Sequence, residues 1–313
     1  MKLLILGAGG IGGYFGGRLA QAGTDVAFLV RPRRREQLAR EGLCIASPLG
    51  DLRVPVKTLL AEELKPGYDF VLLTCKTYDL DSACEAIAPA MDGRCAIVPM
   101  LNGLDHFESL DRRFGKENVL GGTCAINVTL GKDGVIHHVG AMQRLAFGER
   151  DGSKSARAAA FGEALAKSAI EWEQAEDIEQ NLWEKIVFLS ALAAVSCLFR
   201  ANVREILAAP GGREAIERTL ATHLEVASRE GHPARAAAIG FARKGLVDPE
   251  SLWNASMLRD MEGGGSVESE PIIGWMLAKA KKHGLDDTIL SLAYTHLKAY
   301  EARRAAGRLP SAH

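Results

Sequence analysis

The chain has 313 residues, enough for two domains at roughly 150 residues each. Lys and Arg total 38 against 39 Asp and Glu, which gives a formal net charge of −1, and 47% of the residues are hydrophobic. This balance excludes disordered and collagen-like chains. It also provides no general field that would attract nucleic acid or an anionic membrane, so we expect neither as a partner.

The cysteines and the apolar segments predict a cytoplasmic protein without a structural metal. The six cysteines form no CxxC pair and have no His at zinc-site spacing, so we expect them to be small buried hydrophobes. Met1 leads into an apolar strand without the pattern of a signal peptide. The longest uncharged apolar stretch, Ile186–Phe199, is shorter than the ~20 residues that span a bilayer, and we expect a buried core helix there.

The first half of the chain alternates short aliphatic runs with helical patterns, which is typical of a parallel sheet covered by helices. We therefore predict an α/β fold, with a Rossmann-type doubly wound domain over residues 1–150. Short runs between residues 125 and 147 predict antiparallel strands that extend this sheet. The predicted parallel strands are Lys2–Leu6, Val26–Val30, Phe70–Thr74, Ala96–Pro99 and one near Val119, and the predicted helices are Ile11–Ala22, Leu80–Ala88 and His106–Phe114.

A polar stretch after Glu149 is suited to a domain boundary, and beyond it the periodicity is helical. We predict an all-α domain over residues 151–313, which binds substrate and could also bury a homodimer interface. Its predicted helices are Ala156–Ser168, Gln180–Phe199, Arg213–Glu230, Pro233–Lys244, a short helix near Trp253–Asp260, Pro271–His283 and Asp287–Arg304.

A glycine-rich loop lies between the first predicted strand and the first predicted helix. It reads Gly7, Ala8, Gly9, Gly10, Ile11, Gly12 and matches GxGxxG in the context that dinucleotide-binding sites require. Gly7 permits the tight turn, Gly9 lets the backbone approach a pyrophosphate, and Gly12 lets the helix pack closely on the strand. The phosphates would then lie at the positive end of the helix. A glycine turn without a ligand is the alternative.

The end of the second predicted strand indicates which dinucleotide binds. An NAD site usually has Asp or Glu there, whereas this strand runs into Arg31, followed by Arg33 and Arg34. A guanidinium at this position would form charge-assisted hydrogen bonds with a 2′-phosphate, which favours NADPH. The spacing does not decide among the three arginines, and a solvated basic turn remains the alternative.

Three polar residues stand out at places where ligands bind in such folds. Lys76 and Asn102 each follow a predicted strand at its carboxyl end, the edge at which open α/β sheets bind ligands. Lys185 immediately precedes the uncharged apolar run, and burying its charge would be costly unless the lysine is paired or functional. Ordinary loop residues and a lysine that reaches back to water are the alternatives.

Several short motifs follow one another in order over nearly the whole chain. They are the glycine loop, Arg31, Thr74-Cys75-Lys76, Asn102-Gly103, Leu182-Trp183-Glu184-Lys185, Ser256-Met257 with Asp260, and Glu268 twelve residues after Ser256. In this ordered combination the chain resembles the ketopantoate reductase (2-dehydropantoate 2-reductase) family. The resemblance implies a Rossmann domain followed by a helical domain, and NADPH-dependent reduction of a 2-oxo acid in pantothenate biosynthesis.

The resemblance also implies a role for each matching residue. Lys76 and Asn102 would line the nicotinamide and substrate site, Lys185 would donate the proton, Ser256 would bind the substrate carboxylate and Glu268 would contact the cofactor ribose. The chemistry fits these side chains, because negative charge develops on the oxo oxygen as hydride arrives at its carbon, and Lys185 would stabilise that charge. No metal is required.

One departure from the family puts the substrate in doubt. Family members typically carry asparagines four and eight residues after the lysine, where this chain has Leu189 and Ala193. Losing those partners would leave polar substrate groups unpaired, at roughly 1–3 kcal/mol each if buried. Ser196 lies about 20° from Lys185 around an ideal helix and could partly compensate.

Three alternatives remain beside this reading. A related hydroxyacid, polyol-phosphate or imine oxidoreductase would share the two-domain plan and is favoured by the apolar Leu189 and Ala193. A non-catalytic NADPH sensor would not need Lys185, Asn102 and Ser256 together. Nucleic-acid binding is the weakest reading, because the Arg31–Arg35 cluster lacks interleaved aromatic residues.

Overall fold

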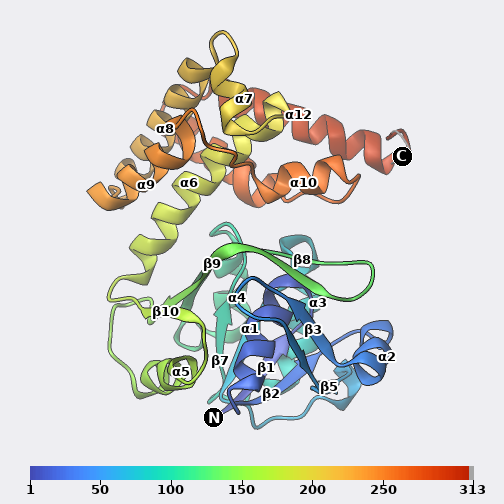
Figure 1. Cartoon of the computed structure of the whole chain (residues 1–313). Helices are drawn as coiled ribbons and strands as arrows, with labels where there is room; N and C mark the ends of the chain where they lie inside the picture. Colours follow the sequence, from blue (N-terminus) through green and yellow to red (C-terminus); the bar gives the residue numbers. More distant parts are fainter. Residues whose placement is uncertain (310–313) are drawn as a thin grey trace. The chain divides into compact units, whose positions relative to one another are not determined.

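The computed structural model describes residues 1–309 and divides the chain into two compact units. The first unit comprises Met1–Leu101 and His106–Glu179, and the second comprises Asn102–Asp105 together with the chain from Gln180 onward. A parallel-sheet Rossmann-type domain followed by a mostly helical domain, as the sequence predicts, is confirmed (Figure 1).

The first unit is built on a five-stranded parallel sheet. The strand order is β5 (Lys57–Leu59), β2 (Asp25–Leu29), β1 (Lys2–Leu6), β6 (Phe70–Leu73) and β7 (Ala96–Pro99). The chain runs from β1 outward through β2 to one edge and from β6 to the other, so the direction of winding reverses at β1. Ligands of such sheets bind beyond the carboxyl ends of the strands at this reversal, where the glycine loop follows β1.

The helices of the first unit follow these strands in turn. They are α1 (Gly10–Gln21), α2 (Pro32–Glu41), α3 (Leu80–Ile87), α4 (His106–Phe114) and α5 (Ala156–Ala166). Helix α2 was not predicted, because six of its ten residues are charged and only Leu38 is buried. The arginine cluster after β2 therefore forms the cap and the first turn of a helix, which begins at Pro32, a residue favoured at this position.

The predicted antiparallel strands exist, but the prediction that they extend the parallel sheet is wrong. Strands β8 (Gly121–Leu130) and β9 (Ile136–Gly148) form an antiparallel pair in a second sheet. The long β9 also pairs in parallel with β3 (Leu43–Ala46) and β10 (Glu171–Gln174), and β3 pairs with β4 (Leu52–Val54). These partners pair with β9, so the hairpin belongs to the second sheet, together with β3, β4 and β10.

The first unit continues past residue 150, where the sequence placed the domain boundary, to Glu179. The reason is packing. The ring of Phe161 on α5 lies 5.1 Å from that of Phe70 and 4.7 Å from that of Phe147, and β10 pairs with β9. The polar stretch before α5 is a turn of the first unit that ends at Ser155, which caps the helix by accepting a hydrogen bond from the Ala158 amide.

The second unit consists of helices around a core centred on α6 (Ile178–Phe199). By length and composition this helix could cross a membrane, but 67% of its apolar window is buried inside the protein, which confirms the prediction of a core helix. The other elements are α7 (Val203–Ala208), α8 (Gly212–Arg229), α9 (Ala236–Val247), α10 (Ser256–Glu262), the π-helical turn η5 (Glu270–Gly274), α11 (Trp275–Lys282) and α12 (Thr288–Ala305).

Candidate active site

The glycine loop is held in shape by bonds that involve its backbone and that of β1. Gly7 has a positive φ of 91°, a conformation that glycine adopts without strain, and its amide donates to the Leu29 carbonyl at 2.9 Å. The Thr74 hydroxyl donates to the Leu6 carbonyl at 2.7 Å. A Cβ on Gly12 would collide with both the Gly7 carbonyl oxygen and the Thr74 hydroxyl, so helix α1 can lie this close only with glycine there.

The opposite holds at Gly9, which faces open space. Within the described part of the chain, residues 1–309, no atom lies within 4 Å of the position that a Cβ on Gly9 would take. Gly9 caps α1 without a side chain, and the first amides of a helix have no partner within it. The positive end of a twelve-residue helix therefore carries donors beside an open backbone, an arrangement that fits a dinucleotide pyrophosphate.

The three candidate arginines have different surroundings. Arg34 is tied to the glycine loop, because its Nε donates to the Ala8 carbonyl at 3.1 Å and its Nη1 to the Gly134 carbonyl at 3.1 Å. Burial lowers the pKa of Arg34. Arg31 instead leaves 80% of its side chain exposed, with Nη2 3.4 Å from the Asp79 carboxylate. Arg34 thus braces the loop, while Arg31 presents its guanidinium to solvent beyond β2.

Lys76 lies at the same edge of the parallel sheet. It is half-buried and begins the turn Thr77–Asp79 that follows β6, the strand paired with β1. The first unit therefore brings the glycine loop, Arg31 and Lys76 to the carboxyl ends of three neighbouring strands. Thr74, which supports the loop from the end of β6, was not predicted as a site residue and was named only within the motif Thr74-Cys75-Lys76.

The remaining candidates belong to the second unit. Lys185 is half-buried on α6, between Glu184 and the buried Ile186. Glu184 is paired with Arg235, whose guanidinium lies 2.6 Å from the carboxylate. The pKa of Glu184 is lowered: burial alone would raise it, and the hydrogen bonds from Arg235 outweigh that effect. The carboxylate next to Lys185 in the sequence is thus paired with Arg235.

Asn102 and Glu268 are connected through the π-helical turn η5. Gly103, which follows Asn102, has a φ of 90°, and a Cβ there would lie 2.8 Å from the Pro271 carbonyl oxygen. Pro271 lies three residues after Glu268, whose side chain is buried at 6% exposure. The close approach at Gly103 therefore sets the loop of Asn102 directly against the turn that follows Glu268.

Ser196 does not compensate for the missing asparagines. Its side chain is fully buried, donates to the Leu192 carbonyl at 2.6 Å and accepts from the Ala255 amide at 3.3 Å. Both partners are backbone groups, because the hydroxyl lies in the core. Leu189 is half-buried and Ala193 is buried, so the helix face beyond Lys185 is apolar as the sequence indicates.

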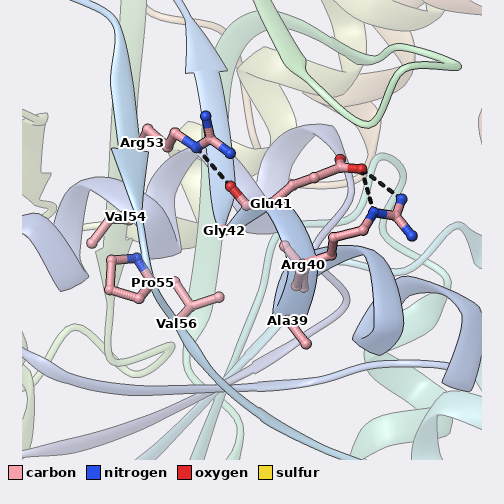
Figure 2. A pocket seen from close by; sticks show the side chains of 9 residues that line it. Ala39, Arg40, Glu41, Gly42, Arg53, Val54, Pro55 and Val56 are labelled. Atoms are coloured by element: carbon pink, nitrogen blue, oxygen red, sulfur yellow. Dashed lines mark hydrogen bonds and ion pairs between the residues drawn. The ribbon is translucent and has the colours of Figure 1, made fainter.

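A hollow of about 350 Å³ lies outside this set of residues, between the end of α2 and β4. Figure 2 shows Arg53, whose Nε donates to the Glu41 carbonyl at 2.8 Å, and the ion pair between Glu41 and Arg40. None of the candidate site residues lines it. Within residues 1–309, no group of three or more His, Cys, Asp or Glu is arranged to hold a metal ion.

Comparison with known proteins identifies the family. The ketopantoate reductase PanE/ApbA family matches residues 3–152 with its N-terminal part and residues 177–301 with its C-terminal part. The chain is 37% identical over 304 residues to the uncharacterized oxidoreductase YkpB of Bacillus subtilis, which covers 97% of this chain and 100% of that protein.

Solved structures agree with this match. The crystal structure of 2-dehydropantoate 2-reductase from Geobacter metallireducens has a TM-score of 0.86 at 28% identity and covers 96% of this chain and 99% of that one. The ternary structure of D-mandelate dehydrogenase with NADH and anilino(oxo)acetate, at 20% identity and a TM-score of 0.85 over 97% of this chain and all of that one, shares the fold. The chain is therefore an oxidoreductase of the ketopantoate reductase PanE/ApbA family.

Proposed function

We propose that this oxidoreductase reduces a 2-oxo acid with NADPH, and that ketopantoate, which would yield pantoate for pantothenate biosynthesis, is the first substrate to test. The observation that carries the proposal is the edge of the parallel sheet, where the open backbone at Gly9 and the exposed guanidinium of Arg31 follow adjacent strands. The open backbone at Gly9 suits a pyrophosphate, and the guanidinium of Arg31 suits a 2′-phosphate.

In the proposed reaction, NADPH supplies the hydride that adds to the carbon of the 2-oxo group. Lys185 stabilises the negative charge that develops on the oxo oxygen and donates the proton that makes it a hydroxyl. Ser256, the first residue of α10, binds the substrate carboxylate. Asn102 orients the carbonyl or the nicotinamide amide, Lys76 offsets substrate charge, and Glu268 accepts hydrogen bonds from the ribose.

The cofactor preference follows from Arg31 rather than from its neighbours. Arg34 already donates to two backbone carbonyls of the first unit. Among residues 1–309 the guanidinium of Arg31 forms an ion pair only with Asp79, and such surface ion pairs contribute about 0–1 kcal/mol, so a 2′-phosphate can displace this contact. We therefore propose Arg31 as the residue that selects NADPH over NADH.

A second candidate function is reduction of a more apolar 2-oxo acid, and Leu189 favours it. Leu189 lies one turn beyond Lys185 and is half-buried, so this position offers a substrate apolar contact in place of a hydrogen bond. We also propose that the enzyme works in the cytoplasm, since the six cysteines form no disulfide within residues 1–309, as expected in a reducing compartment. Assembly into a homodimer stays a prediction.

A substrate panel tests the proposed function. Purified protein is mixed with NADPH or NADH and with ketopantoate, 2-oxoisovalerate or phenylglyoxylate, and cofactor oxidation is followed by absorbance. We expect turnover with NADPH and at least one of these acids. Ketopantoate should be the preferred acid if Leu189 does not weaken its binding. NADPH binding without turnover of any acid would contradict the proposal and favour a sensor.

A further inference from the structure

Two buried hydroxyl groups on α6 each hold a different functional segment of the second unit. We propose that Ser190 and Ser196 are positioning residues, with Ser190 fixing the segment of Glu268 and Ser196 fixing the segment of Ser256, both relative to Lys185 on the same helix. This inference rests on the proposed function, because it takes Glu268 as a cofactor contact and Ser256 as a substrate contact.

Ser196 holds the start of α10. Its hydroxyl is fully buried and accepts a hydrogen bond from the amide of Ala255, the residue that caps α10 and precedes Ser256. The same hydroxyl donates to the Leu192 carbonyl of α6 at 2.6 Å, which fixes the direction of its lone pairs. The Ser196 side chain thus fixes the position of Ser256 relative to α6.

Ser190 holds the π-helical turn after Glu268. Its hydroxyl is fully buried and lies 3.2 Å from the Ile272 carbonyl of η5 and 3.1 Å from Nε2 of His223 on α8. Turns of this π-helical type are frequent at functional sites. The same turn meets Gly103 at the Pro271 carbonyl, so Ser190 supports the segment against which the loop of Asn102 lies.

The protonation of His223 fits this arrangement. Nδ1 lies 2.7 Å from the Thr219 carbonyl, which can only accept, so Nδ1 carries a proton. Burial lowers the pKa of His223 to about 4, which leaves Nε2 without a proton at neutral pH. The hydroxyl proton of Ser190 is then shared between Nε2 and the Ile272 carbonyl, and both acceptors are held by one residue of α6.

The spacing on α6 explains why two positioning residues are needed. Ser190 and Ser196 follow Lys185 by five and eleven residues, or about 7.5 and about 16.5 Å along an ideal helix. The segments of Glu268 and Ser256 therefore contact the same helix at separate points, each at its own distance along the helix from Lys185. Displacement by about 1 Å of a group that positions substrate or cofactor is enough to lower turnover strongly.

The test compares the same substitution at both positions. Ser196→Ala should raise the KM for the 2-oxo acid about tenfold, as expected for one lost hydrogen bond, and leave the KM for NADPH within about twofold. Ser190→Ala should do the reverse. Thr222→Val is the control, because it removes another buried hydroxyl of the second unit, one that donates to the Asp286 carbonyl before α12 and should lower only Tm.

Two results would overturn the proposal. One is that both alanine variants lower Tm but change neither KM, and the other is that both raise the two KM values alike. If the wild type reduces no 2-oxo acid, the proposed function fails, and NADPH titration decides this inference separately. Weaker NADPH binding by Ser190→Ala than by Ser196→Ala would then support it, and equal Kd values would overturn it.

Discussion

In the first unit the glycine loop offers backbone amides as candidate ligand contacts, beside the side chains of Arg31 and Lys76. In the second unit the candidate contacts are side chains alone, on α6, on α10, on the loop of Asn102 and on the segment before η5. The geometry of the first unit depends on glycines, whose missing Cβ atoms allow close packing. A Cβ on Gly12, Gly16 or Gly17 would press into Thr74, Phe28 or Leu43. The second unit achieves its geometry by burying polar groups such as Ser190 and His223.

The difference has a simple consequence for mutagenesis. Adding a single carbon should damage the first unit, because its interior is already filled to van der Waals contact. Removing a single polar atom should damage the second unit, because a buried partner is then left unsatisfied. The following substitutions test this contrast, in order of decreasing expected effect.

The largest effect is expected for Gly12→Ala. Its new methyl group would overlap the Gly7 carbonyl oxygen, a backbone atom, and the Thr74 hydroxyl, which can move away only by losing its hydrogen bond to the Leu6 carbonyl of β1. We expect a loss of about 3 kcal/mol or more in the free energy of unfolding, measured by denaturant titration.

Gly9→Ala is the matched control for that substitution. A methyl group at Gly9 would meet no atom of residues 1–309 within 4 Å, so Tm should stay unchanged. NADPH binding should weaken, because the methyl group occupies the space of the pyrophosphate. If Gly9→Ala bound NADPH as tightly as the wild type, the glycine loop would not be the phosphate site.

A comparable effect is expected for His223 at acidic pH. Burial lowers the pKa of His223 to about 4 from an ordinary value of 6.5. Between these pH values the imidazole is protonated in the unfolded chain and neutral in the folded protein. The free energy of unfolding should therefore fall as the pH drops through this window, by roughly 3 kcal/mol in total.

His223→Asn removes this titration. The variant should be less stable than the wild type at neutral pH, because the bond to Ser190 is lost, and the difference in Tm should shrink as the pH falls toward about 4.5. Parallel Tm curves for the two proteins would show that the ring is not held neutral.

A smaller effect is expected for Arg31→Ser. The loss of charge-assisted hydrogen bonds to a 2′-phosphate should weaken NADPH binding about tenfold and leave NADH binding unchanged. Arg33→Ser is the control, because Arg33 is an exposed residue of the same charge in the first turn of α2. Equal losses for both variants would indicate a general field rather than a specific contact.

The smallest effect is expected for Leu189→Asn. An amide one turn beyond Lys185 should lower the KM for ketopantoate relative to 2-oxoisovalerate by about threefold to tenfold, since it can bond a hydroxyl that only ketopantoate has. Leu189→Ala separates this gain from the mere removal of bulk. No change in the ratio of the two KM values would show that this face of α6 does not contact substrate.

Local signals predicted much of the fold. Strands β1 and β7 and helix α4 have the bounds that the sequence predicts, and α6 ends at Phe199 as predicted. Helix α7 was missed although Asn202 and Glu205 form a capping box, a recognisable start signal. Such short elements carry too few apolar residues to show a helical period.

Features that depend on distant partners could not be predicted. The β8 and β9 hairpin was expected, but its membership in a second sheet depends on β3 and β10, which lie far away in the sequence. Among the site residues, the sequence could not separate Arg31 from Arg34, because the bonds of Arg34 to Ala8 and Gly134 form only in the folded chain.

We propose above all that Lys185 donates the proton in NADPH-dependent reduction of a 2-oxo acid. The most direct measurement compares kcat for wild type and Lys185→Ala with the preferred acid, together with NADPH Kd values from titration. We predict a fall in kcat of about 10²- to 10⁴-fold with NADPH binding unchanged. A Lys185→Ala enzyme that keeps the kcat of the wild type would contradict it.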